Sequence, residues 1–426
     1  MNAIPRRRLV IVVRADPVIC GHSGEARNLA EAALEHGFED VRIVTWPIER
    51  LLESGLPLKP LDSVLPYSPG ITVERPDPVG NYKVIDGRYQ AGVTGRLVEL
   101  FTDGVPTVCM SLYLSPHTLA VTDALAAARA TGLPVDVITI AEAVGSDITN
   151  VVRTSVDQGR FGAAAHVLTS YLASDRCVAV SEYTRDVIIR AAAEIDAIHG
   201  TRFADRCERS ISISYPAIDS RLFTGIEPAD TDAALAARGL ARDGYVLFLS
   251  RLSKAKGVEE LIDGFALSEE ACDYGLVVAG NGPEAADLEA YAAASAASDR
   301  VVFLHDVDDA EKPHLMAGSA AFVLPSKPLP EFTETFGIAL VEKMLAGGGP
   351  VITTDTGGIG EAVGDCALII DIEDPAGIAA ALDRALRMSP EERLDWETRA
   401  RAHSLQFDRA NVFERLFSGL VPTGAR

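Results

Sequence analysis

Two glutamates and a glycine in residues 325–363 have a spacing that suits a ligand bound at the start of a helix. Glu334 lies in an expected loop after a strand, and Gly337 opens an expected helix on which Glu342 lies farther along. Glycine lets a ligand approach the free backbone N–H groups there, and the positive end of the helix dipole favours phosphate oxygens. Glu342 can accept hydrogen bonds from a ribose diol, and Glu334 from a sugar hydroxyl. The alternative is an amphipathic helix with solvated carboxylates.

Two cations lie earlier in the chain, just after the expected strand 245–250. Arg251 and Lys256 precede Gly257 in the segment SRLSKAKG. Open parallel sheets bind ligands at the carboxyl ends of their strands, and a diphosphate leaving group needs positive charge there. The alternative is a solvated basic turn.

Two further glycine turns follow expected strands, at residues 280–283 (GNGP) and 354–361 (TDTGGIGE). Either turn alone is more often structural than ligand-binding. Their order relative to the cations and the glutamates is far more specific than any single segment.

This ordered set resembles the C-terminal domain of family 4 of the GT-B glycosyltransferases, which reads GRLxxxKG, then GxGP, then PSxxExFGxxxxExMAxGxPVVxTxxGGxxE. The match covers about residues 245–371. It implies that two cations neutralise a donor diphosphate, that two glutamates contact the donor sugar and the ribose, and that the anomeric configuration is retained without a bound metal. The implied catalytic residues are Arg251, Lys256 and Glu334, and the implied donor-binding residues are Gly280, Gly282, Phe336, Gly337, Ile338, Glu342, Gly357 and Gly358.

The N-terminal half resembles the same family more loosely. Its segment 19–46 is similar to the family's first glycine loop and helix, and the resemblance places this loop near the acceptor or a phosphate. The loop residues are Gly21, His22, Ser23 and Gly24. Segments 178–188 and 213–223 are similar to a later strand with its helix and to the linker between the domains.

One departure from the family concerns the donor sugar. Where the family has a histidine after the expected strand 135–140, this chain has Ala141. Glu142 or Asp147 can take a polar role near the sugar, and His117 is a further candidate, although a lone histidine is more often a helix cap or a packed residue. No catalytic base is assigned, since the departing phosphate can deprotonate the acceptor in the mechanism proposed for such enzymes.

Length and composition limit the class of protein. At 426 residues the chain predicts two domains, and its 48% hydrophobic and 23% charged residues are typical of globular proteins. A formal charge of −22 disfavours nucleic acid and anionic membrane surfaces, so we expect small-molecule partners, namely a donor and an acceptor. The sequence leaves open whether the protein forms a homo-oligomer.

Targeting, redox and metal signals are weak. The apolar run 9–13 is too short for a signal peptide, and no stretch approaches the ~20 apolar residues that span a membrane, so we expect a cytoplasmic protein without membrane insertion. The six cysteines are scattered and read as reduced thiols. The segment 306–309 (DVDD) mimics a DxD metal motif, but we expect no metal or cofactor.

Alternation of apolar runs with alanine-rich stretches predicts an α/β fold with parallel sheets. We expect strands at residues 9–13, 41–45, 107–110, 135–140, 177–180, 211–213, 245–250, 276–280, 301–305, 321–326 and 350–355. Residues 56–87 are rich in proline and glycine and read as a long loop that could line an acceptor pocket.

The resemblance implies a GT-B architecture of two Rossmann-like, doubly wound domains that face a central cleft. We place an acceptor-binding domain at residues 1–235, a donor-binding domain at 236–400 and a helix at 401–426 that packs back on the first domain, with a hinge near residue 235.

The expected function is transfer of a sugar from a nucleoside-diphospho-sugar to a small-molecule acceptor. Two alternatives stay open: a GT-B-fold epimerase or phosphorylase, and a non-catalytic sugar-nucleotide-binding protein, which the absent histidine makes conceivable. Residues 14–34 resemble actinobacterial glycosyltransferases of specialised metabolism such as antibiotic biosynthesis, including those of lincosamide pathways. That resemblance implies a GDP-linked donor, tighter binding of GDP than of UDP, and a thiol or hydroxyl acceptor.

Overall fold

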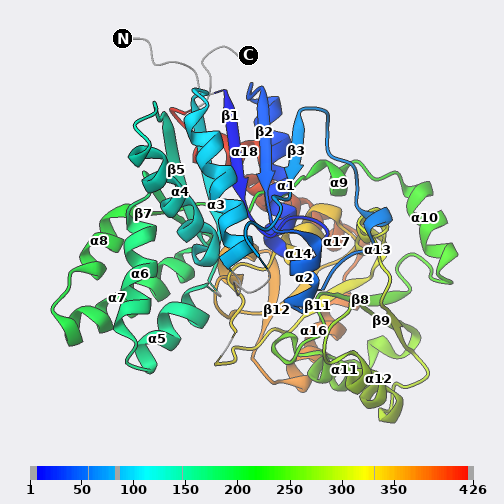
Figure 1. Ribbon diagram of the computed structural model, residues 1–426. Coiled ribbons are helices and arrows are strands. Elements are labelled where there is room, and N and C mark those ends of the chain that lie inside the picture. Colours follow the sequence, from blue (N-terminus) through cyan, green and yellow to red (C-terminus); the bar gives the residue numbers. More distant parts are fainter. Residues whose placement is uncertain (1–6, 56, 82–86, 146, 331, 421–426) are drawn as a thin grey trace. The chain divides into compact units, whose positions relative to one another are not determined.

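The computed structural model describes residues 7–55, 57–81, 87–145, 147–330 and 332–420. The chain divides into two compact units, which we call unit 1 (Met1–Ala217 with Arg409–Arg426) and unit 2 (Ile218–Asp408). Each unit is built on one parallel sheet with helices packed on it (Figure 1). The predicted α/β class with two doubly wound domains is confirmed.

The sheet of unit 1 has seven strands in the order β3-β2-β1-β4-β5-β6-β7, all parallel. The strands are β1 (Arg8–Val12), β2 (Asp40–Val44), β3 (Ile71–Glu74), β4 (Thr107–Leu112), β5 (Val137–Ala143), β6 (Arg176–Ala179) and β7 (Ile211–Ile213). The central strands β1 and β4 are buried along their whole length, which explains why their sequences are continuous apolar runs.

The prediction of a long loop at residues 56–87 is wrong in part. Among its described residues, Ile71–Glu74 forms strand β3 and pairs in parallel with β2. No residue of β3 is fully buried, because β3 is an edge strand, and its short ITVE sequence therefore lacks the apolar run of a central strand. Residues 56 and 82–86 of this segment lie outside the described residues.

Helices cover both faces of this sheet, and one of them comes from the end of the chain (Figure 1). Phe413 and Phe417, from α18 and just beyond it, are fully buried in the core formed by α1 and β1. The helices of unit 1 are α1 (Gly21–Glu35), α2 (Ile48–Glu53), α3 (Gly87–Thr102), α4 (Leu119–Ala130), α5 (Thr154–Asp157), α6 (Phe161–Leu172), α7 (Glu182–His199), α8 (Phe203–Ser210) and α18 (Arg409–Leu416).

The sheet of unit 2 has six parallel strands in the order β10-β9-β8-β11-β12-β13. The strands are β8 (Tyr245–Leu249), β9 (Gly275–Ala279), β10 (Val301–Leu304), β11 (Ala321–Leu324), β12 (Val351–Thr354) and β13 (Ala367–Ile370). The sequence missed β13, an edge strand in which Ile369 is 50% exposed, so the ALII run gave only a weak apolar signal.

The helices of unit 2 start before its first strand. They are α9 (Arg221–Thr224), α10 (Pro228–Ala237), α11 (Val258–Leu267), α12 (Ala285–Ala294), α13 (Lys312–Gly318), α14 (Ile338–Ala346), α15 (Ile359–Val363), α16 (Pro375–Leu386) and α17 (Pro390–Ser404). The division between the units falls after Ala217, whereas the sequence placed the boundary at residue 235. Residue 235 lies within α10, which packs on α13 of the same unit, with Leu235 only 1% exposed. The second division falls after Asp408 rather than at residue 400.

Both sheets reverse their strand order at one point, between β1 and β4 in unit 1 and between β8 and β11 in unit 2. In open α/β sheets, the carboxyl ends of the strands at such a reversal form the usual ligand-binding edge. The segments after β8 and β11 therefore lie at the edge where a ligand is expected.

Candidate functional site

In unit 2, the segments that follow β8 and β11 join through an ion pair. The Lys256 ammonium bonds the Glu334 carboxylate, although the two residues are 78 positions apart. Their side chains are 7% and 14% exposed, and the Phe332 ring lies 5.3 Å from the ammonium. The structure thus brings together two of the three residues that the sequence predicted as catalytic, a cation and a carboxylate, at the expected ligand edge of the sheet.

The second glycine turn holds the backbone of Glu334. Gly358 N donates to Glu334 O at 2.9 Å. Gly357 has φ of +62°, and a Cβ there would overlap the same carbonyl oxygen. Position 357 needs glycine because two backbone segments touch there, so the TDTGG turn positions the loop that carries Glu334.

The first glycine turn packs in the same way against the segment after β8. A Cβ at Gly280 would overlap the Ser250 carbonyl oxygen, and one at Gly282 would overlap that of Leu252. Leu252 N donates to Asn281 O at 2.9 Å, which completes this contact. All the motif segments of unit 2 therefore converge on the carboxyl ends of neighbouring strands, as the sequence predicted.

The start of α14 presents backbone N–H groups to a ligand. Gly337 is its N-cap, with φ of +97°, and no side chain caps the helix. Phe336 is 2% exposed and contacts Phe407 at 5.0 Å between ring centroids, which anchors the turn. Ile338 begins the helix, so an anion at this end would meet uncapped donors and the positive dipole end.

Glu342 lies about 6 Å along the axis from Ile338, on the same helix. Its Oε1 accepts a hydrogen bond from Lys312 Nζ at 2.6 Å. Arg251, just after β8, is exposed. This edge of unit 2 therefore offers an exposed guanidinium, two lysine–glutamate pairs and a helix start.

In unit 1, the predicted glycine loop is the first turn of a helix. Gly21, His22, Ser23 and Gly24 all belong to α1, which begins at Gly21 without a side-chain cap. The loop prediction was wrong because the strand ends earlier and the intervening turn lies before Cys20. The helix start nevertheless follows β1 at the ligand edge of the sheet.

Glu142 lies at the end of β5 and is fully buried. Glu25 on α1 is 2% exposed, and none of the four carboxylate oxygens of these two residues has a hydrogen-bond partner in the described part of the chain. Burial raises the pKa of Glu25 to about 8, and a backbone contact with Ala217 opposes this shift. Burial, then the nearby Glu25 and Asp147 carboxyls, raise the pKa of Glu142 well above its usual value. Burial therefore favours the neutral form of both carboxyl groups.

The two other candidates for a role near the sugar, Asp147 and His117, are both buried and hydrogen-bonded to the backbone. Asp147 accepts from Leu114 N and Gly145 N at 2.9 Å and from Ile148 N at 3.0 Å, while burial raises its pKa to about 6. His117 is 1% exposed and bonds the Leu112 carbonyl through Nδ1, and burial lowers its pKa to about 3. His117 is therefore neutral, packed between aromatic rings, with Nε2 lacking a partner in the described residues.

Ala141, at the position where the resemblance implies a histidine, is fully buried in the core. Its side chain points to the opposite face of β5 from that of Glu142, because successive strand residues alternate. Glu142 cannot simply substitute for the histidine from the next position. The sequence did not indicate Glu25 or Lys312 as site residues. A glutamate in an alanine-rich helix and a lysine in an acidic segment are both expected to face solvent.

The DVDD segment takes part in ion pairs and turns. Asp306 accepts from Arg238 at 3.0 Å, and Asp308 accepts from Glu311 N at 2.8 Å before α13 begins. Across the described residues, no three acidic, histidine or cysteine side chains are grouped as metal ligands. Nor does any described helix have the length and apolarity to cross a bilayer.

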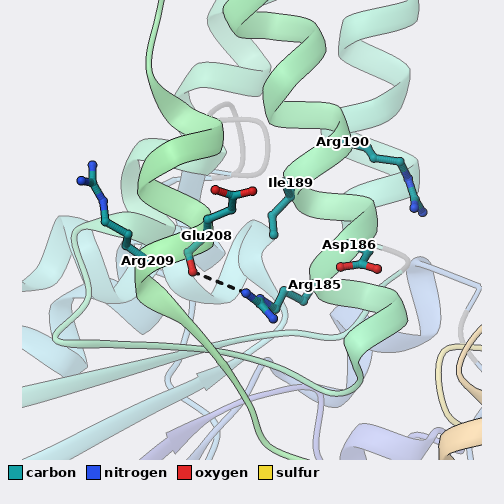
Figure 2. Close-up of a pocket in the computed structure, with 6 residues that line it drawn as sticks. All are labelled: Arg185, Asp186, Ile189, Arg190, Glu208 and Arg209. Atoms are coloured by element: carbon teal, nitrogen blue, oxygen red, sulfur yellow. Dashed lines mark hydrogen bonds between the residues drawn. The ribbon is translucent and has the colours of Figure 1, made fainter.

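A surface pocket of about 630 Å³ lies between α7 and α8, and none of the predicted site residues lines it (Figure 2). Arg185 donates to the Glu208 carbonyl across it, while the side chains of Arg190 and Arg209 point outward from the two helices (Figure 2). Charged, open walls without a convergent set of groups do not resemble a catalytic site.

Comparison with known proteins agrees with this geometry. Residues 236–403 match the family described as "Glycosyl transferases group 1". The chain is 24% identical to the N-acetyl-alpha-D-glucosaminyl L-malate synthase of Bacillus anthracis, over 96% of this chain and 94% of the relative. It is 31% identical to the 2-deoxystreptamine glucosyltransferase of Streptomyces kanamyceticus, over 32% of this chain and 35% of the relative.

Solved structures share the fold. The Anabaena Alr3699/HepE protein in complex with UDP and glucose has a TM-score of 0.68 at 17% identity, covering 97% of this chain and 99% of that one. WaaG, a glycosyltransferase of lipopolysaccharide biosynthesis, has a TM-score of 0.62 at 17% identity, with coverages of 96% and 100%. The chain therefore shares the two-domain fold of these solved structures, and its residues 236–403 match the family described as "Glycosyl transferases group 1".

Proposed function

We propose that the protein transfers a sugar from a nucleoside-diphospho-sugar, with retention of configuration and without a metal, to a small-molecule acceptor. The observation that carries this proposal is the convergence of Lys256, Glu334 and the uncapped start of α14 on one sheet edge. A diphosphate at that helix start meets free N–H groups, and Lys256 and Arg251 offset the charge that develops on the leaving group.

The donor sugar and ribose are assigned to the two glutamates. Glu334 lies beside Lys256, close to where the anomeric carbon would leave the diphosphate. Glu342 lies slightly more than one helical turn beyond Ile338, the first residue of α14. Carboxylates of this kind accept hydrogen bonds from hydroxyls and hold the donor in a reactive orientation. The departing phosphate takes the acceptor proton, so no protein base is required.

We assign the donor to the GDP-linked class and the acceptor to the hydroxyl- or thiol-bearing small molecules of specialised metabolism. The support is the resemblance of residues 14–34 to actinobacterial enzymes and the partial similarity to the Streptomyces kanamyceticus glucosyltransferase. The Anabaena neighbour was solved with UDP and glucose, so a UDP-linked donor is the direct alternative.

The test begins with thermal shifts of the whole chain in UDP, GDP, ADP and dTDP. A ligand that binds the folded state raises the melting temperature by mass action, so GDP should give the largest shift. Equal or larger shifts with UDP would overturn the GDP assignment alone, whereas no shift with any nucleotide would overturn the donor site.

Turnover separates transfer from its alternatives. With a matching GDP-sugar and a panel of hydroxyl and thiol acceptors, free GDP should form only when an acceptor is present, and the product should keep the donor's anomeric configuration by NMR. Nucleotide release without acceptor would indicate an epimerase-type reaction, and an inverted product would exclude the retaining mechanism.

A further inference from the structure

A lysine contacts the glutamate to which we assign the ribose. Lys312, the first residue of α13, places its Nζ 2.6 Å from Glu342 Oε1. The two side chains are 22% and 13% exposed, so the pair is partly shielded yet accessible to a ligand. The segment DVDDAEKPH contains four acidic residues, and Lys312 is its one lysine or arginine.

Neighbouring groups hold this pair in place. The Phe223 ring lies 5.4 Å from the Lys312 ammonium. Next to Glu342, Lys343 is fully buried and donates to Met316 O at 2.8 Å and to Ser319 Oγ at 2.9 Å, at the other end of α13. Helices α13 and α14 are thus joined at both ends of α13. A pair held in this way is pre-organised for a ligand, because little side-chain freedom is lost on binding.

The pair combines the two hydrogen-bonding abilities that a hydroxyl needs. An ionised carboxylate only accepts hydrogen bonds, whereas a lysine ammonium has three N–H donors and no acceptor. Within the described residues, Lys312 uses one of those donors on Glu342. Two N–H groups therefore stay available to an oxygen bound beside the carboxylate.

We propose that Lys312 acts with Glu342 to bind the ribose 2′,3′-diol of the donor nucleotide and sets the preference for ribonucleotides over 2′-deoxyribonucleotides. Glu342 accepts from the hydroxyl groups, and Lys312 donates to a hydroxyl oxygen. The inference rests on the proposed function, since it places a nucleotide on α14. Its new element is Lys312, a specificity-determining residue from a different helix.

A purely structural ion pair is the competing explanation. Such a pair would join α13 to α14, and partly exposed pairs contribute little to stability. Its removal would affect binding of every nucleotide alike. A residue that binds the 2′-hydroxyl affects only the nucleotide that has one, because a polar site loses most when its hydroxyl partner is missing.

The experiment measures the dissociation constants of GDP and 2′-deoxy-GDP by calorimetry for four forms of the full chain. These are the wild type, Lys312→Met, Lys312→Arg, and the control Arg387→Met, which breaks an exposed pair with Glu270 elsewhere in unit 2. If UDP binds more tightly than GDP, then UDP and 2′-deoxy-UDP replace the guanine pair. Thermal melting of each variant checks that it is folded.

We expect the wild type to bind GDP at least about tenfold more tightly than 2′-deoxy-GDP. Lys312→Met should reduce this ratio to below about threefold by weakening GDP, while 2′-deoxy-GDP binding changes by less than about twofold. Lys312→Arg should restore part of the ratio, and Arg387→Met should leave it unchanged.

Two results overturn the inference while leaving the proposed function intact. One is a wild-type ratio near unity, and the other is an equal loss of both nucleotides in Lys312→Met. If no ribonucleotide binds the wild type, the proposed function itself fails, and the inference fails with it.

Discussion

Replacement of Glu25 by glutamine should remove a large part of the pH dependence of stability. Glu25 is 2% exposed on α1, and its carboxylate oxygens have no hydrogen-bond partner among the described residues. Burial raises its pKa from 4.5 to about 8. Glutamine keeps the shape of the side chain but cannot ionise, so the variant isolates the titration from the packing.

The sign follows from where the proton is held. Between 4.5 and about 8 the unfolded chain has lost the Glu25 proton while the folded chain retains it, so the free energy of unfolding falls as pH rises through this window and then levels off. One pKa unit corresponds to about 1.4 kcal/mol, so Glu25 alone should remove about 3 kcal/mol of stability between pH 5 and pH 8.

The variant should therefore match the wild type at pH 5, where Glu25 is neutral, and exceed it by about 3 kcal/mol at pH 8. For a domain of this size that difference is about 6 to 12 °C in melting temperature. Differential scanning calorimetry at four pH values from 5 to 8 measures it. Glu142 keeps its own titration in this variant, so some pH dependence should persist.

The matched control is Glu53→Gln, a glutamate on α2 of the same unit whose side chain is 58% exposed. It should follow the wild type at every pH. The reasoning is refuted if the difference in melting temperature between Glu25→Gln and the wild type is the same at pH 5 and pH 8.

Three further changes address the site and the scaffold. Lys256→Ala removes the cation beside Glu334 and should weaken nucleotide binding and turnover by at least about tenfold. Calorimetry measures the binding and nucleotide release measures the turnover. If neither changes, the site assignment is wrong. Gly357→Ala forces a side chain onto the Glu334 carbonyl at a φ of +62°. We expect lower turnover and a free energy of unfolding, measured in denaturant, that is lower by about 1 to 3 kcal/mol. Unchanged turnover and unchanged stability would contradict the close approach of the two backbones. Ser389→Ala removes the capping box of α17 and should cost about 1 kcal/mol without changing turnover, so a fall in kcat would show that α17 contributes to the site.

The candidate site of unit 2 was predictable because its charged residues lie in short segments with glycines between them. Each segment follows a strand, and parallel strands end at one edge, so the residues after β8 and β11 had to meet. The glycines carried a separate signal, since Gly280 and Gly357 stand where two backbones touch. Their contacts account for the spacing that the sequence showed.

The environment of the candidate residues in unit 1 was less predictable, since it is set by burial. Glu25 and Glu142 lie 117 positions apart, and nothing in either local sequence indicates that both lose contact with water. The same limit applies to the edge strands β3 and β13, whose short runs lack the continuous apolar pattern of the central strands.

The sequence by itself determined the fold class, the approximate positions of every described strand except β3 and β13, and which charged residues and glycines follow the strands of unit 2, because periodicity and glycine spacing are local properties. Only the tertiary structure decided which charges meet. It joined Lys256 to Glu334 and Lys312 to Glu342, and it buried two glutamates without partners, since contacts between distant segments depend on how helices pack on the sheets.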